Sequence, residues 1–381
     1  MAWEITANGF RWVLACIAFF FITVTQSATA SPTDNLFIPT SNPLPNLAVC
    51  GKTNGQVQLA LNAEPGIPHF VEASSNLVNW SLMTTNSDNA TNRQISLNAT
   101  TETCFYRASR SPIAIFAYVL AAKTFISING IGVISDSWNS HDLNQSLNGQ
   151  YNGYAGTNGD FALVNGIMNL GNTFVNGDIY LGPGTALVTG PYGGASGQIL
   201  PDQFFLFPEV VLPTINSNGN PILWTNAPGT VSAHSFTNSG YFTITDSGSL
   251  TVEAGANVVL LVQVTNYSPA SINIKGGTTN PGTLTMYQEA GNITLGRSNT
   301  GGAINNRPEN FIYFGLPGVT EIMFGTGSTF VGAVYAPSAS GNFFSLSTMG
   351  FIGSCVVSNA TVNGHVLFHY DTSLRTNGPC R

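Results

Sequence analysis

Three residues near the carboxyl end have types and spacing that suit a metal site: His365, His369 and Asp371. Residues two or four apart share one face of an extended strand, and two imidazoles with a carboxylate could hold Zn²⁺. The alternative is structural, with residues 369–371 forming a hydrogen-bonded cap on the last turn of the fold. We favour the cap, and predict no catalytic residue, no cofactor and no metal at these three positions.

A calcium loop is the next candidate. Residues 142–146, Asp-Leu-Asn-Gln-Ser, have the spacing of acid and amide that opens such a loop. Leu147 and Gly153 stand where the loop requires glycine and glutamate, so the pattern fails. We interpret the Asn-Gly-Asp segments 158–160 and 176–178 as turns. Structural calcium elsewhere is the one cofactor that the sequence leaves open.

Signatures of other chemistries are weak. Residues 51–53 end like a phosphate loop, but Asn46 replaces its first glycine, and no G-x-S-x-G serine elbow occurs. Acids are sparse, and we see no acidic pair that recurs on neighbouring repeats, as a glycosidase or lyase on a repeat scaffold would need. The mid-chain basic residues Lys275, Arg297 and Arg307 have no acid cluster beside them.

Composition narrows the class of protein. Charged residues make up 8% of the 381 residues, against an average of about 25%. Hydrophobic residues reach 43%, which argues against disorder. The net charge of −7 and the absence of a basic cluster argue against nucleic acid as a partner. A polar but uncharged surface is typical of secreted β-rich proteins.

The elements that must position these residues are marked by a repeated corner. Residues 172–179 and 359–366 both read N-x-x-V-N-G-x-[IV], and shorter copies lie at 127–130 and 163–166. Asn-Gly turns a chain sharply, so stacked strands of a solenoid are expected around these corners. The sequence-predicted turn residues are Asn129, Gly130, Asn165, Gly166, Asn176, Gly177, Asn363 and Gly364.

The chain divides into four predicted parts: a signal peptide (1–30), a linker (31–47), a small antiparallel β-sandwich (48–110) and a right-handed parallel β-helix-like solenoid (111–381). The predicted fold class is therefore all-β. A short helix is expected over 113–123, where it could cover the first coil. Prolines between 185 and 230 predict an excursion outside the solenoid, held by Phe204, Phe205, Phe207 and Trp224.

The first 30 residues resemble a secretory signal. Arg11 precedes a short apolar run, and Ala28-Thr-Ala30 fits the small-x-small cleavage rule. A pilin-like leader is the alternative, since Gly9-Phe10 precedes the run, but no glutamate follows. Four cysteines then remain, and local pairing of Cys50 with Cys104 and of Cys355 with Cys380 is the simplest of three connectivities. Buried free thiols are the alternative.

Two resemblances follow from particular residues. The segments 72–80, 84–86 and 105–107 are similar to a small β module (A-S-S-N-L-x-N-W, T-N, F-Y-R) in exported proteins of verrucomicrobial and planctomycete-type bacteria. This implies an accessory domain without activity, in which Trp80 is more readily a core residue than a sugar platform. The segments 330–337, 351–353, 360–364 and 368–374 resemble the closing motifs of an uncharacterised bacterial surface-protein domain, and Asp136-Ser-Trp138 fits its opening half. That resemblance implies a β-helix-like body over about 115–375 with no catalytic residues.

We therefore expect an exported, non-catalytic structural or adhesin-like protein, secreted or at the cell surface of a bacterium. Its partners would be glycans or other surface proteins, with no membrane span after signal removal. One alternative is a polysaccharide lyase or hydrolase on the same scaffold. Another is a carbohydrate-binding protein that uses Trp80, Trp138, Trp224 and tyrosines.

Overall fold

The computed structural model describes residues 46–53, 56–63, 69–75, 80–86, 91–98, 105–110, 114–276, 280–295, 307–325 and 329–379. Strands are the main regular structure of these residues, and no α-helix forms among them, which confirms the predicted all-β class. The predicted signal peptide and most of the predicted linker lie outside the described residues. The first strand begins at Asn46, two residues before the predicted start of the sandwich at 48.

Residues 46–110 form two three-stranded antiparallel sheets. One sheet has the order β1 (Asn46–Thr53), β2 (Gln56–Asn62), β5 (Asn92–Asn98), and the other has the order β4 (Ser81–Asn86), β3 (His69–Ser74), β6 (Phe105–Arg110). Alternate residues of the strands are buried, as on a sheet with one wet face. Both sheets contribute to one apolar core, which includes Leu59, Val71 and Ile95. This is the predicted sandwich.

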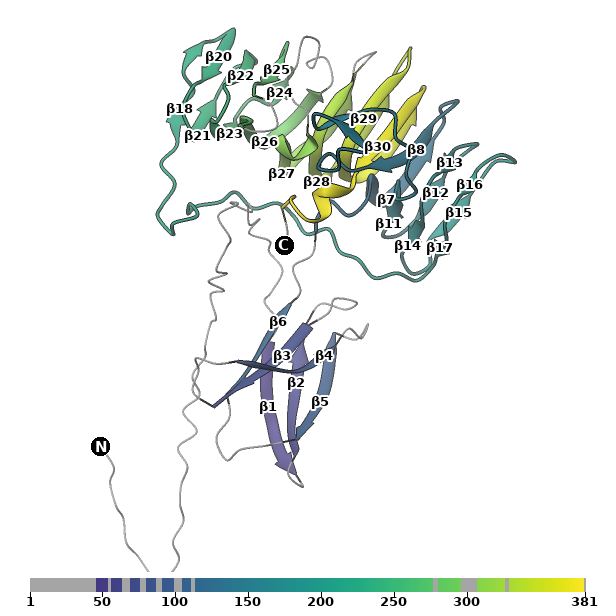
Figure 1. The fold of residues 1–381 in the computed structure, drawn as a ribbon, viewed down its shortest axis with the longest axis vertical. Helices are drawn as coiled ribbons and strands as arrows, with labels where there is room; N and C mark the ends of the chain where they lie inside the picture. The colour runs from purple at the N-terminus through teal and green to yellow at the C-terminus, as the bar shows by residue number, and fades with distance from the viewer. Residues whose placement is uncertain are drawn as a thin grey trace, which may run out of the picture. The chain divides into compact units, whose positions relative to one another are not determined.

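The remaining residues build a stack of parallel coils (Figure 1). Its first part contains β7 (Leu120–Ile128), β8 (Ile134–Trp138), β11 (Phe161–Leu163), β12 (Ile167–Asn169), β13 (Phe174–Val175), β14 (Ile179–Leu181), β15 (Ala186–Val188), β16 (Gly194–Ala195) and β17 (Ile199–Leu200). Its second part contains β18 (Thr225–Asn226), β21 (Gly240–Ile244), β23 (Asn257–Val262), β24 (Asn266–Tyr267), β26 (Thr283–Leu295), β27 (Phe311–Phe324), β28 (Phe330–Phe344), β29 (Met349–Asn363) and β30 (Val366–Asp371). A side sheet holds β19 (Gly229–Thr230), β20 (Ala233–Phe236), β22 (Ser249–Val252) and β25 (Ile272–Ile274), and β9 (Ser146–Leu147) and β10 (Gln150–Tyr151) form a separate hairpin.

The order of coils in space differs from their order in sequence. From β7 the chain builds coils in one direction until β17, and from β18 it builds from the opposite end back toward β7. The coil made last, β29 and β30, then pairs with the coil made first, β7 and β8. One row of register partners crosses the whole stack and is buried from Leu260 to Ile179: Thr225, Phe242, Leu260, Met286, Tyr313, Val334, Cys355, Leu120, Phe161, Ile179, Ile199.

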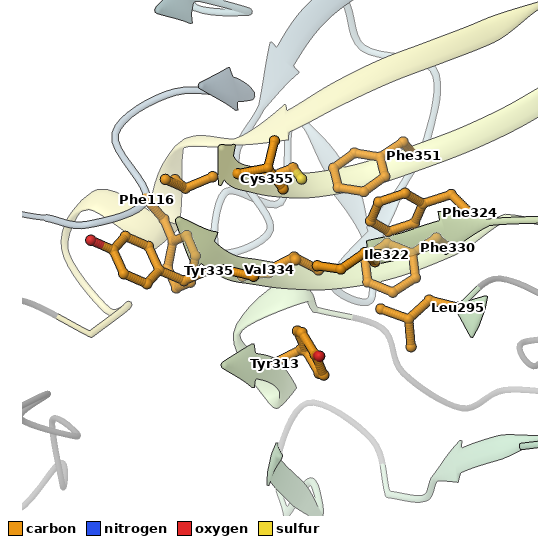
Figure 2. Close-up of a cluster of buried hydrophobic side chains, with 14 of the residues drawn as sticks. Phe116, Leu295, Tyr313, Ile322, Phe324, Phe330, Val334, Tyr335, Phe351 and Cys355 are labelled. Atoms are coloured by element: carbon orange, nitrogen blue, oxygen red, sulfur yellow. The ribbon is translucent and has the colours of Figure 1, made fainter. Parts of the chain in front are cut away.

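The core inside the coils is aromatic. Phe324 stacks on Phe343 with ring centroids 4.4 Å apart, and Phe330 stacks on Phe351 at 5.1 Å. Figure 2 shows several of these rings beside Cys355, all within the stack. Burying one phenylalanine side chain stabilises the folded state by on the order of 2–3 kcal/mol, because its apolar surface leaves water. The aromatic stack therefore holds the coils of the second half together.

Two sequence predictions in this part are wrong in detail. No helix forms over the described residues 114–123; instead β7 begins at Leu120, and residues 120–122 are fully buried between β29 and β11. Alanine favours a helix in isolation, but here small side chains fit the crowded interior between two parallel neighbours. The excursion is also narrower than 185–230, because β15, β16 and β17 occupy 186–200 and β18 starts at Thr225.

The excursion itself, residues 201–224, runs along the outside of the stack from β17 back to β18 (Figure 1). Phe207 is buried against the core, and Phe205 and Trp224 are partly buried on it, as predicted. Phe204 is 43% exposed and does not hold the segment. Glu209 adds an ion pair to Lys123 at 2.5 Å and a hydrogen bond from Ser338.

Candidate functional site

The three residues considered as zinc ligands do not converge. His365 is exposed in the corner between β29 and β30, and its Nδ1 atom lies 2.9 Å from Thr348 Oγ1. His369 and Asp371 lie on β30 and are both buried, but each is held by different partners. Within the ranges that the structure describes, no three His, Cys, Asp or Glu side chains are grouped to bind a metal ion.

His369 belongs to a buried polar cluster that the sequence did not reveal. Its Nδ1 atom lies 2.7 Å from Oδ1 of Asp136, on the register-paired strand β8. The ring stacks on Tyr151, with centroids 4.0 Å apart, and the Tyr151 hydroxyl donates to Asp136 Oδ2 at 3.1 Å. Burial and the Asp136 carboxylate raise the pKa of Tyr151 well above its ordinary value. The β9–β10 hairpin, which carries Tyr151, thus covers this pair from outside.

Asp371 caps the final turn of the chain. Its Oδ1 atom accepts hydrogen bonds from Ser140 N at 3.0 Å and Ser373 N at 3.1 Å, so it begins the short 3₁₀ helix η2 (Thr372–Arg375). Its other oxygen, Oδ2, is buried without a hydrogen-bond partner among the described residues. This geometry matches the predicted cap and uses the carboxylate for backbone positioning.

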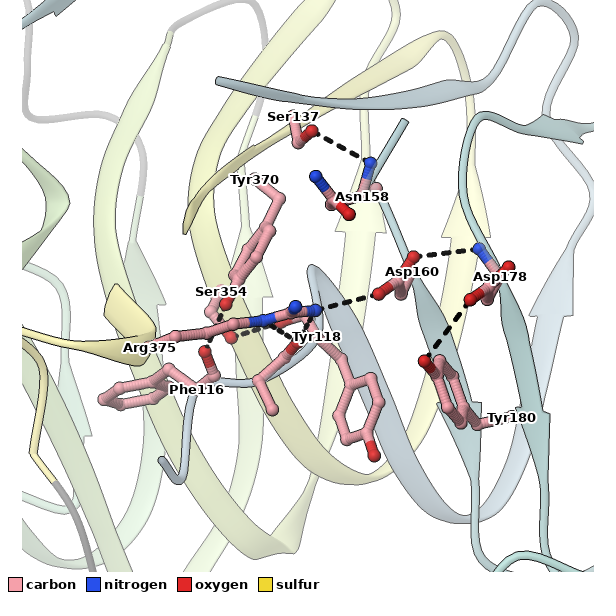
Figure 3. A network of polar contacts seen from close by, with 12 residues as sticks. Phe116, Tyr118, Ser137, Asn158, Asp160, Asp178, Tyr180, Ser354, Tyr370 and Arg375 are labelled. Atoms are coloured by element: carbon pink, nitrogen blue, oxygen red, sulfur yellow. Dashed lines mark hydrogen bonds and ion pairs between the residues drawn. The ribbon is translucent and has the colours of Figure 1, made fainter. Parts of the chain in front are cut away.

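Two acids do recur on neighbouring coils, contrary to the sequence analysis. Asp160 Oδ1 accepts from the backbone N–H of Asp178 at 2.8 Å (Figure 3). Asp178 Oδ1 in turn accepts from the backbone N–H of Gln198 at 2.6 Å. The three residues occupy the same corner of three successive coils, each after a glycine. The sequence analysis predicted turns at residues 158–160 and 176–178. It missed that Asp160 and Asp178 lie on neighbouring coils, because that placement depends on how the coils are aligned.

We call Asp160 and Asp178 the acid ladder. Arg375, near the end of the chain, binds it through Asp160 (Figure 3). Its Nη2 atom donates to Asp160 Oδ2 at 2.9 Å and to the carbonyl oxygen of Ala117 at 2.9 Å. The guanidinium also lies 5.4 Å from the centre of the Tyr370 ring. Sequence reasoning missed Arg375 because it follows β30 and is distant in sequence from both contacts.

The electrostatics of this ladder follow from burial. Desolvation raises the pKa of Asp160, and the Asp178 N–H and Arg375 only partly offset that effect. Burial would lower the pKa of Arg375, but the neighbouring Tyr370 and Asp160 raise it overall. Desolvation, together with Asp160 and Asp178, raises the pKa of Tyr180. The cluster is therefore built around the ion pair between Arg375 and Asp160, in which the Asp160 carboxyl group is desolvated.

An aromatic group lies on the outside of the same coils. Tyr118 contacts Tyr180 edge to face at 5.2 Å, and Tyr118 also meets Phe205 of the excursion at 5.9 Å. All three are partly buried.

The tryptophans considered for sugar binding differ in placement. Trp138 is completely buried, and Trp224 packs on the core against Tyr241, so neither offers the flat exposed face that a sugar platform requires.

Trp80, in the small sandwich, is half-buried, and the Arg107 guanidinium lies 4.3 Å from the centre of its ring. One face of that indole is therefore already covered by a cation.

Asp142, the candidate calcium ligand, accepts hydrogen bonds from Asn144 N at 2.9 Å and Gln145 Nε2 at 3.1 Å. Its carboxylate closes a local turn.

The cysteine pairs remain predictions. Cys50 lies exposed in β1, and Cys355 is completely buried in β29; both are free thiols among the described residues. Their predicted partners, Cys104 and Cys380, lie outside the described residues. Burial raises the pKa of the Cys355 thiol well above its ordinary value, which makes it a poor nucleophile at neutral pH.

Comparison with known proteins gives one match. A family model described as a domain of unknown function (DUF7305) matches residues 223–377, which run from just before β18 to just past the end of η2. No curated protein and no solved structure matches the chain. In the described ranges no helix is long and apolar enough to span a bilayer.

Proposed function

We propose that this chain is an exported, non-catalytic structural or adhesin-like protein at the surface of a bacterial cell. One observation carries the proposal: the polar side chains best suited to chemistry bond to partners inside the protein. His369 is bonded to Asp136, Asp371 to a turn, and Asp160 to Arg375. A catalytic group must instead be free to meet a substrate in a cleft.

Further support comes from the surface and the sequence. The solenoid presents uncharged outward rows, such as Asn342, Thr361, Ser127 and Asn169 in register across four coils. The signal-like start and the closing motifs of β28 to η2 favour export and display on the surface. The matched family domain contains these closing motifs, and we infer that it is the surface-protein domain that they resemble.

Cell fractionation and a glycan screen test the proposal. Native cells treated with an external protease should lose the protein, and the purified chain beginning at Ser31 should release no sugar from a polysaccharide panel. Binding to a glycan array without turnover would fit an adhesin. Recovery of the protein only from protease-protected cytoplasm, or release of oligosaccharides, would contradict the proposal.

A second candidate function is polysaccharide cleavage beside the acid ladder. The observation that favours it is the position of Asp160 and Asp178 on adjacent coils, close to Arg375 and the Tyr118–Tyr180 pair. If the panel shows turnover, Asp178→Asn should abolish it because that carboxylate is the more accessible of the two. Asp142→Asn, which lies in a separate turn, is the matched control.

A further inference from the structure

A pocket lies at the corner where the first two coils of the stack meet. Its walls come from residues 128–132, at the end of β7, and from residues 169–172, at the end of β12. Its volume is about 350 Å³, near the lower limit for small-molecule sites, which span about 300–1,000 Å³. We call it the corner pocket. No residue of the His369 cluster or of the acid ladder lines it.

Backbone hydrogen bonds fix both walls of the corner pocket. The N–H groups of Asn129 and Gly130 donate to the carbonyl oxygen of Val362, at 2.9 and 3.2 Å. In the other wall, the Leu170 N–H donates to the carbonyl oxygen of Val188 at 2.9 Å. The pocket is therefore preformed, and a ligand would not have to order these segments when it binds.

Two side-chain amides present their amino groups at this corner. Asn169 Oδ1 accepts from the Gly171 N–H at 3.0 Å, and Asn172 Oδ1 accepts from the Tyr192 N–H at 3.4 Å. An amino group could not accept these bonds, so each amide is held with its oxygen toward the backbone and its nitrogen away from it. Neither Nδ2 atom has a hydrogen-bond partner among the described residues. Each therefore offers donors to a ligand.

The surroundings of these donors are apolar or neutral. Ile131 belongs to one wall and is 89% exposed, and Tyr192, on the next coil, is 80% exposed. No charged side chain lines the corner pocket, and residues 124–200 contain no Lys or Arg. A phosphate or carboxylate ligand would therefore find no counter-charge here.

We propose that the corner pocket binds a neutral oligosaccharide, an inference that rests on the proposed adhesin-like function. The fixed amino groups of Asn169 and Asn172 match the hydroxyl oxygens of sugars, and the exposed Ile131 and Tyr192 match the apolar faces of sugar rings. A peptide is disfavoured, because peptide recognition uses a free sheet edge, an apolar groove or an arginine cluster. The residues that line the corner pocket form none of these.

Isothermal titration calorimetry of the full mature chain tests the site with cellohexaose, mannohexaose and chitohexaose as neutral probes and hexagalacturonate as the acidic one. The parent protein should bind at least one neutral probe and should not bind hexagalacturonate. Asn169→Asp and Asn172→Asp each keep the oxygen that accepts from the backbone but lose the amino donors. Each should raise Kd for the neutral probe about tenfold, the effect of losing one or two hydrogen bonds.

Asn152→Asp is the matched control. Asn152 is exposed outside the corner pocket, and its Oδ1 atom likewise accepts from a backbone N–H, that of Tyr154, at 3.1 Å. Its substitution should leave Kd unchanged, and all three variants should keep the circular dichroism spectrum and melting temperature of the parent.

A folded parent that binds none of the neutral probes, or that binds hexagalacturonate as tightly as they bind, would overturn the assignment. Equal affinity in the parent and all three variants would overturn it as well. None of these results touches the proposed surface function as long as external protease removes the protein from intact cells. Protein protected in the cytoplasm would overturn that function, and the inference with it.

Discussion

At the scale of single residues, the Asn-Gly corners work by close stacking. Asn129 Nδ2 donates to Asn363 Oδ1 at 3.1 Å, so the corner after β7 lies directly on the corner after β29. A Cβ atom on Gly130 would come 1.9 Å from the carbonyl oxygen of Gly364. Gly364 has a φ of 122°, but Gly130 and Gly177 do not have positive φ. Gly177 is therefore required by lack of space and not by a left-handed backbone, because a Cβ atom there would lie 2.5 Å from Asp160 Oδ1.

Three substitutions at one corner should separate these effects. Val362 is completely buried, so Val362→Asp should lower the free energy of unfolding by about 3–5 kcal/mol by burying a carboxyl group without a partner. Gly364→Val should cost about 1–3 kcal/mol through backbone strain, with a clash against Ser345 adding to it. Asn363→Asp should change stability by less than about 0.5 kcal/mol, because the residue is exposed and the new carboxylate still accepts from Asn129.

Thermal and urea melts of the three variants provide the measurement. The order Val362→Asp, Gly364→Val, Asn363→Asp depends on an inward valine and a turning glycine. A melt in which Asn363→Asp is the most damaging variant would contradict the stacked-corner geometry.

At the scale of elements, the excursion matters because it joins the two ends of the stack. Its outer residues are exposed, while Phe207 and Val210 are buried in the core. The Tyr335 hydroxyl donates to the carbonyl oxygen of Pro208 at 2.9 Å and fixes the middle of the segment. The excursion is therefore a strap fixed at particular side chains rather than a free linker.

Phe207 and Phe204 form a matched pair for testing that attachment. Phe207→Ala should destabilise the protein by about 3 kcal/mol and speed proteolysis within 201–224, because it leaves a cavity under the strap. Phe204→Ala should do neither, since its ring is 43% exposed. Equal protease sensitivity in the two variants would show that Phe207 does not hold the segment.

At the scale of the whole molecule, the chain closes on itself in the middle of the stack. The first coil lies between the last coil and the second, so neither half has a complete set of neighbours alone. Arg375 and the Phe351–Phe368–Phe161 ring contacts add to this junction. The two halves should behave as one cooperative unit despite their separation in sequence.

A protease site inserted between Asn218 and Gly219, in an exposed turn of the strap, tests this closure. After cleavage the two fragments should elute together in gel filtration and separate only in denaturant, because β29 and β30 still pair with β7 and β8. An uncleaved sample carrying the same insertion is the control. Fragments that separate in native buffer would contradict the observed coil order.

The buried tyrosines predict a loss of stability in alkali. Burial raises the pKa of Tyr267, Tyr287, Tyr313 and Tyr370 above the ordinary value. The folded state therefore retains these protons when the unfolded chain releases them. Stability should be complete below about pH 9 and should fall as the pH rises above about 10, through the unfolded phenol pKa toward the folded one. Circular dichroism and phenolate absorbance recorded together should show unfolding and ionisation in one step; ionisation of all tyrosines while the fold persists would contradict it.

The sequence by itself determined the local features. The alternation of 56–61 and 93–97 predicts the sandwich strands. The apolar run 258–264 predicts a strand buried on both faces; most of its residues are buried, but the strand ends at Val262 and Gln263 is exposed. The Asn-Gly pairs marked the corners, with Val175 and Val362 pointing inward before them. These features depend on side-chain period and turn conformation, which are properties of neighbouring residues.

Only the tertiary structure decided which coils are neighbours. Three contacts each join residues more than two hundred positions apart: the register pair Cys355 and Leu120, the Asp136–His369 contact and the Asp160–Arg375 ion pair. The expected helix became β7 for the same reason, because parallel partners arrive from both halves of the chain. Strand pairing in a solenoid depends on the free energy of stacking whole coils, and no local pattern in the sequence encodes which coil lies above another.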